Sequence, residues 1–142
     1  MMDYYLHQAK LKPGALELLH RMKEKSIPMA IATATKDKLA IPALEKHGLK
    51  DFFSFVQTTE NAGFPKAQPD YWKLAAQRGR KNAHEVVVLE DSFYAAEIVN
   101  GLGMKLIGVE DHSAEPYRAE MVKLSNQYVI NLNDVDLSLF KE

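Results

Sequence analysis

Hydrophobic and polar residues follow two different spacings along this chain. In the segment 13–25, Leu16, Leu19 and Met22 recur every three residues, a spacing typical of one face of a helix. Residues 86–89 are instead apolar at every position, which is typical of a strand buried on both faces of a parallel sheet. Segments of the two kinds take turns along the sequence, so the pattern predicts helices that alternate with strands.

The predicted elements make up a complete alternating series. Helices are expected over residues 15–25, 36–46, 70–80, from Ser92 to Gly101, and 114–124, with a short last helix from residue 134. Strands are expected over residues 29–33, 52–57, 86–89, 105–109 and 128–132, and a loop over 58–69. Strands separated by helices run parallel with right-handed crossovers. The order therefore predicts an α/β fold with an open, doubly wound parallel sheet.

Polar residues follow several of these strands at the point where each strand ends. Thr33 ends the first strand, Lys66 lies in the loop after the second, and Glu90 and Asp91 follow the third. Ligands of open α/β sheets bind beyond the carboxyl ends of the strands. Adjacent carboxylates suit Mg²⁺, and a hydroxyl with an ammonium group suits a phosphoryl group. The set predicts phosphoryl-transfer chemistry at this edge.

Each of these residues also has an ordinary structural explanation. A threonine at a strand end often caps a helix, a loop lysine is usually solvated, and paired acids favour the first turn of a helix. Together, in this order and spacing, they favour a site. The five histidines show no metal-binding spacing, and Gly101-x-Gly103 lacks the third glycine of a dinucleotide loop.

Composition narrows the classes of function. The chain has 142 residues, 18 basic and 19 acidic, and no cysteine. The balanced charge gives no reason to expect nucleic acid or an acidic membrane as partner, and the lack of cysteine excludes disulfides and thiolate-bound metals. No apolar run is long enough to span a membrane, and the first residues lack the apolar centre of a signal peptide. A single cytoplasmic domain is expected.

Several short motifs resemble those of a known family. They are Lys12-Pro13-Gly14, Ile31-Ala32-Thr33-Ala34-Thr35-Lys36, Lys66-Ala67-Gln68-Pro69-Asp70, Leu89-Glu90-Asp91-Ser92, and Gly103-Met104 followed by Ile107-Gly108-Val109. In order and spacing, the chain resembles the haloacid dehalogenase-like (HAD) hydrolases, especially the branch of beta-phosphoglucomutase and small sugar-phosphate phosphatases. Two departures are Ala67, where relatives carry proline, and Ala95, where they carry glycine.

The resemblance implies a role for each motif residue. Thr33, the backbone N–H of Ala34 and Lys66 would bind phosphate, while Glu90 and Asp91 would hold Mg²⁺. It also implies that residues 1–142 form one partial HAD-like core domain. Residues 1–12 would be a remnant of the connection between cap and core, and the sheet would lack its usual first strand.

The first motif of the family, an Asp-x-Asp pair at the end of that strand, is the main departure. The only acid before Pro13 is Asp3, and no apolar run precedes it, so we expect no nucleophile and name no catalytic residue. The cap domain, which selects the substrate, has no counterpart either. The chain is therefore expected to be a truncated form, and inactive alone.

Three hypotheses follow from the resemblance. By lineage the chain is a Mg²⁺-dependent phosphatase or phosphomutase, acting on a small phosphorylated metabolite through an aspartyl-phosphate. Alternatively, it is a non-catalytic module that binds a phosphorylated ligand or a protein partner, or it is completed by another polypeptide. Without the first strand, the strands that end at Thr33 and at Glu90 each have an apolar edge. These edges are expected to pair with each other or in a homodimer.

Overall fold

The computed structural model describes residues 12–140, in which five short strands alternate with six α-helices. The strands are β1 (Ile31–Thr33), β2 (Val56–Thr58), β3 (Val87–Glu90), β4 (Lys105–Val109) and β5 (Gln127–Val129). The α-helices are α1 (Ala15–Glu24), α2 (Asp37–Lys46), α3 (Thr59–Ala62), α4 (Pro69–Arg78), α5 (Phe93–Gly101) and α6 (Arg118–Leu124). Short 3₁₀ turns cover Lys50–Phe52, Ala83–Glu85, His112–Tyr117, Leu132–Asp134 and Leu137–Phe140. The predicted alternation is confirmed.

All strand pairings are parallel, as the sequence predicts. β1 pairs with β2, which places Thr33 opposite Thr58. β4 pairs with both β3 and β5, and Glu90 lies opposite Gly108. Because parallel strands end at the same edge of a sheet, each group of strands presents its terminal polar residues together.

The edges of β1 and β3 do not pair with each other, which was one of the two expected arrangements. Among residues 12–140 the strands form two groups, β1–β2 and β3–β4–β5, and β1 does not pair with β3. Direct pairing of these two edges with each other is therefore not what the structure shows. A homodimer stays a prediction, which sedimentation velocity measures. Asp3 and the expected cap-to-core remnant, apart from Lys12, lie outside the described residues.

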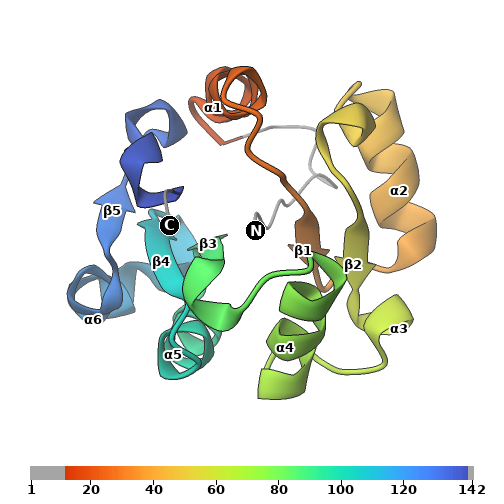
Figure 1. The fold of residues 1–142 in the computed structure, drawn as a ribbon. Coiled ribbons are helices and arrows are strands. Elements are labelled where there is room, and N and C mark those ends of the chain that lie inside the picture. The colour runs from red at the N-terminus through yellow and green to blue at the C-terminus, as the bar shows by residue number, and fades with distance from the viewer. Residues whose placement is uncertain (1–11, 141–142) are drawn as a thin grey trace.

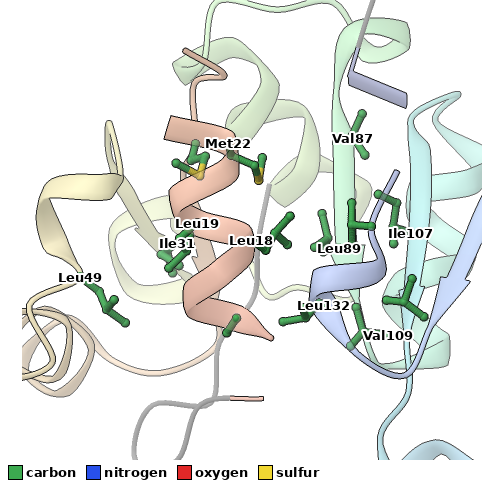
Figure 2. Close-up of a cluster of buried hydrophobic side chains, with 14 of the residues drawn as sticks. Leu18, Leu19, Met22, Ile31, Leu49, Val87, Leu89, Ile107, Val109 and Leu132 are labelled. Atoms are coloured by element: carbon green, nitrogen blue, oxygen red, sulfur yellow. The ribbon is translucent and has the colours of Figure 1, made fainter. Parts of the chain in front are cut away.

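The first of two apolar clusters lies under α1, on one face of the strands (Figure 1). Figure 2 shows Leu18, Leu19 and Met22 of this helix packed between Ile31 on one side and Leu89 on the other. The three-residue spacing predicted that Leu16 is buried, but its side chain is 41% exposed. The buried stripe of α1 runs through residues 15, 18, 19 and 22, because a helix repeats every 3.6 residues and not every three.

The second cluster lies on the opposite face, beneath α4 and α5 (Figure 1). Tyr71 and Trp72 of α4 are fully buried there, together with Val88 of β3 and Leu106 of β4. Burying each such side chain stabilises the fold by about 1.5–3 kcal/mol. Because apolar side chains of β3 contribute to both clusters, this strand is covered on both faces, as its unbroken apolar run predicts.

Some predicted boundaries are wrong. The strand expected over 52–57 begins only at Val56, and the loop expected over 58–69 contains α3. Thr58 caps the start of this short helix: its hydroxyl accepts a hydrogen bond from the Asn61 N–H, and the Asn61 side chain accepts one from the Thr58 N–H. The helix expected over 114–124 begins at Arg118, after a 3₁₀ turn that contains Pro116. In the described part of the chain, no helix is long and apolar enough to cross a membrane.

Candidate phosphate and metal site

The end of β1 supplies the first group of the candidate site. Thr33 is the last residue of the strand and is buried, and Ala34 directly after it is exposed. The Thr33 hydroxyl accepts a hydrogen bond from the Thr35 N–H at 3.1 Å, which folds the chain back at the strand end. A hydroxyl group that accepts one hydrogen bond can still donate its own proton to a ligand.

Lys66 joins the two groups of strands. It lies in the loop before α4, its side chain is only 3% exposed, and its Nζ lies 3.1 Å from Oε2 of Glu90 at the end of β3. Trp72 of α4 fixes this loop, because its Nε1 donates a hydrogen bond to the Lys66 carbonyl oxygen at 3.0 Å. A lysine is rarely buried without a charged partner, and removing one member of such a pair is strongly destabilising. The structure thus places these two predicted site residues in direct contact.

Glu90 is held by donors at both of its carboxylate oxygens. Oε1 accepts hydrogen bonds from the N–H of Asp91 at 3.0 Å and from the N–H and hydroxyl of Ser92 at 3.1 Å each. Oε2 faces Lys66. Ser92 directly precedes α5, but its side chain makes no cap hydrogen bond, because its hydroxyl donates to Glu90 instead. Glu90 is therefore fixed in one orientation toward Lys66.

Asp91, next to Glu90, has a buried oxygen without a hydrogen-bond donor. Its Oδ2 is buried and accepts no hydrogen bond from any described residue, while the ammonium group of Lys12 lies 3.3 Å away. Burial raises the pKa of Asp91 to about 6, and the neighbouring charge of Glu90 adds to this, although Lys12 acts in the opposite direction. A buried carboxylate oxygen without a donor is a position where a cation is favoured.

Two further charged residues, Lys12 and Asp111, lie beside Asp91, and sequence reasoning missed both. With Thr33, Lys66, Glu90 and Asp91 they form the strand-end corner. The Nζ of Lys12 lies 2.8 Å from Oδ1 of Asp111 and 3.3 Å from the Glu110 carbonyl oxygen. Burial alone would lower the pKa of Lys12, but the hydrogen bond to Asp111 and the charge of Asp91 outweigh it and raise the pKa. Asp111 follows the apolar run of β4, so the strand-end rule that found Asp91 would also have found Asp111.

The carboxylates of this site fit a metal ion that needs few protein ligands. No three His, Cys, Asp or Glu side chains between residues 12 and 140 gather around a common point. Mg²⁺, however, is held by one or two carboxylates together with several waters and substrate oxygens. The unsatisfied Oδ2 of Asp91, with Asp111 on the other side of Lys12, matches that requirement. The donor set therefore fits Mg²⁺ through Asp91.

One cavity lies away from this corner. It has a volume of about 210 Å³ and lies near the amino ends of β1 and β3, with Met29, Ala30 and Val86 in its wall and Arg80 and Lys81 among its polar lining residues. None of the residues predicted from the strand ends lines it. The oppositely charged side chains lie instead at the carboxyl ends of the strands.

Comparison with known proteins points to one family. The family model described as "Hydrolase: haloacid dehalogenase-like hydrolase" matches residues 3–98. The chain is 29% identical over 110 residues to a phosphorylated carbohydrates phosphatase of Thermotoga maritima, covering 78% of this chain and 51% of that protein. It is 30% identical over 112 residues to a ribulose-1,5-bisphosphate 5-phosphatase of Halopiger xanaduensis, covering 79% of this chain and 45% of that protein.

A solved structure shows the same fold. The crystal structure of a putative beta-phosphoglucomutase from Thermotoga maritima superimposes with a TM-score of 0.74 at 25% identity, covering 92% of this chain and 58% of that chain. The chain thus spans about half the length of the two curated relatives. The match of the family model covers more than half of the residues and includes the three motifs that contain the predicted site residues, from Thr33 to Asp91.

Proposed function

The chain belongs to the haloacid dehalogenase-like hydrolases, and we propose that its strand-end corner binds the phosphoryl group of a small phosphorylated metabolite. The reaction of the lineage would be Mg²⁺-dependent phosphate-ester hydrolysis or phosphoryl transfer between positions of a sugar. The names of two relatives, a phosphatase of phosphorylated carbohydrates and one of ribulose 1,5-bisphosphate, support a sugar phosphate as the substrate class.

The contact between Lys66 and Glu90 carries this proposal. Nothing in the apolar core requires a buried lysine in the loop before α4, and burying its charge costs free energy that the ion pair with Glu90 only partly returns. We expect such a buried pair where the positive charge also binds a ligand. A phosphoryl group at this corner would supply that partner, because its oxygens carry negative charge throughout the transfer.

Thr33, Ala34 and Lys66 would divide the recognition of phosphate between them. The Thr33 hydroxyl and the Ala34 N–H would donate hydrogen bonds from the end of β1, and Lys66 would neutralise charge from the other side. Donors fixed in position before the ligand arrives need no reorganisation, so they stabilise developing charge more than flexible groups do.

Asp91 would be the direct metal ligand, and Glu90 would act beside it by fixing Lys66. Mg²⁺, when bound, would neutralise phosphate oxygens and orient the group for in-line attack. In the structure the ammonium group of Lys12 faces the same oxygen of Asp91, at 3.3 Å. We therefore expect binding of Mg²⁺ to require that Lys12 moves away from Asp91.

We also propose that these 142 residues bind phosphate but do not turn over phosphate esters by themselves. The family's attacking carboxylate comes from an Asp-x-Asp pair, and the only acid before Pro13 is Asp3. Removal of a nucleophile abolishes most of the rate while leaving binding groups intact. A second polypeptide that supplies the missing pair would restore turnover.

Two measurements test this proposal together. Isothermal titration with inorganic phosphate in Mg²⁺ should show binding that is lost in Lys66→Met, while Lys50→Met, which changes an exposed lysine, should bind normally. Hydrolysis of p-nitrophenyl phosphate should stay at background with and without Mg²⁺. Absence of phosphate binding in the wild-type chain would refute the binding role. Turnover that Lys66→Met abolishes would refute the proposed inactivity.

A further inference from the structure

Two consecutive aromatic residues of α4 contact both phosphate-binding segments. The hydroxyl of Tyr71 lies 3.3 Å from the carbonyl oxygen of Thr33, at the end of β1. The Nε1 of Trp72 donates to the carbonyl oxygen of Lys66 at 3.0 Å. Both aromatic side chains are fully buried. One short stretch of helix thus holds the backbone of Thr33 and the backbone of Lys66 at the same time.

Tyr71 lies where β1 and β2 end together. Its hydroxyl lies 3.0 Å from the Gln57 carbonyl oxygen as well as 3.3 Å from that of Thr33, so its single proton is shared between the two strands. The Gln57 side chain returns a hydrogen bond, since its Nε2 donates to the Tyr71 carbonyl at 2.7 Å. Because Gln57 is also fully buried, this group of hydrogen bonds is shielded from water and strongly favours one geometry.

Trp72 acts on the lysine at two places. Its indole N–H fixes the Lys66 backbone, and the ring centroid lies 5.6 Å from the Lys66 ammonium nitrogen, within the range of a cation–π contact. A phenylalanine would fill most of the same apolar space without holding the carbonyl. The polar atoms of Tyr71 and Trp72 are therefore not needed to fill the core, and both are directed at the candidate site.

We propose that Tyr71 and Trp72 are positioning residues, which set the spacing between the donors at Thr33 and the ammonium group of Lys66. This inference rests on the proposed phosphate site, because the spacing matters only if both residues hold one ligand. A tetrahedral anion is bound well only when its donors are held within about 0.5 Å of their working positions. Loss of either contact should loosen one side of the site and leave the other side in place.

The test uses Tyr71→Phe and Trp72→Phe, each of which removes one polar donor and keeps an aromatic ring. Val99→Ala is the control, because Val99 is fully buried in the same apolar cluster but has no polar group in its side chain. Hydrogen exchange without ligand is followed at two amides. The Thr35 N–H bonds the Thr33 hydroxyl and reports on the end of β1, and the Gln68 N–H bonds the Pro65 carbonyl and reports on the Lys66 loop.

We expect Tyr71→Phe to speed exchange at Thr35, and Trp72→Phe to speed it at Gln68, by about fivefold each, the factor for one lost hydrogen bond. Each variant should also weaken binding of inorganic phosphate three- to tenfold, whereas Val99→Ala should do neither. If both amides keep their wild-type exchange rates, the aromatic pair serves only core stability and the inference is wrong. If the wild-type chain binds no phosphate, the proposed function fails and the positioning role fails with it. If the wild-type chain binds phosphate but the two variants bind it equally well, the positioning role alone is wrong.

Discussion

The ammonium nitrogen of Lys66 lies 3.1 Å from Oε2 of Glu90, and the two side chains are 3% and 0% exposed. This contact connects the loop before α4 to the end of β3, across the two groups of paired strands. The attraction between the two charges offsets part of the free-energy cost of burying each of them. The pair therefore has a structural consequence that is separate from any role toward phosphate, and stability measurements detect it without a ligand.

Replacement of Lys66 by methionine should lower the free energy of unfolding by about 3 kcal/mol, because Glu90 is left buried without a counter-charge. Adding Glu90→Gln should restore much of that loss, since the amide oxygen still accepts from Asp91 and Ser92 but carries no charge. Urea denaturation of the single and double variants measures both effects.

The matched control for this prediction is Lys50→Met, which breaks an exposed ion pair with Glu45. Exposed pairs contribute little, so its free energy of unfolding should stay within about 0.5 kcal/mol of the wild type. A Lys66→Met protein as stable as this control would contradict the account of the buried pair. So would a double variant that is no more stable than the single one.

Asp91→Asn should stabilise the protein near neutral pH, by about 1 kcal/mol. Burial raises the pKa of Asp91 to about 6 in the folded state, above its ordinary value. The folded protein therefore binds this proton more tightly than the unfolded chain does. The resulting stability is fully present below about pH 4 and is lost as the pH rises through 6. The neutral asparagine avoids that loss, so its advantage should be largest at pH 7.5 and should disappear below about pH 4.

Asp111→Asn is the control with the opposite sign. Although burial acts to raise it, hydrogen bonds from Lys12 and Ser113 lower the pKa of Asp111. Its contribution to stability is present at neutral pH and is lost as the pH falls through the lowered pKa. Asp111→Asn should thus destabilise the protein at pH 7.5. Thermal unfolding of both variants across this pH range decides, and the same sign in both variants would contradict the assignment.

Lys12→Met should tighten the binding of a divalent ion at Asp91 by about tenfold, because a bound ion no longer has to displace an ammonium group from the same oxygen. Mn²⁺ serves as the probe, and its free concentration is followed by electron paramagnetic resonance. Lys12→Arg keeps the positive charge and should bind Mn²⁺ as the wild type does. Equal affinity in all three proteins would show that Lys12 does not compete with the metal.

The sequence predicted the fold and much of the corner for one physical reason. Residues buried on both faces of a parallel strand must be apolar, so the first polar residue after such a run marks the edge where ligands bind. This rule located Thr33 and Glu90, and the structure shows that Glu90 reaches Lys66. Helix positions followed from periodicity, except where a three-residue spacing gave the wrong face to Leu16.

Other features depend on contacts between residues far apart in the sequence. Nothing local shows that Lys12 faces Asp91 and Asp111, which are 79 and 99 positions away. The large apolar rings of Tyr71 and Trp72 indicate core positions on α4. Only the structure shows that their polar atoms donate to the carbonyl oxygens of Thr33 and Lys66. Short helix α3 was missed because its start depends on a reciprocal cap between Thr58 and Asn61.

The most direct test of the central claim is a titration of the wild-type chain with inorganic phosphate in Mg²⁺, followed by ¹H–¹⁵N spectra. The account predicts that the largest shifts occur at the amides of Thr33, Ala34 and Lys66, at the carboxyl ends of the strands. It would be contradicted if no amide shifts, or if the shifts gather around Arg80 and Lys81 at the cavity near the amino ends.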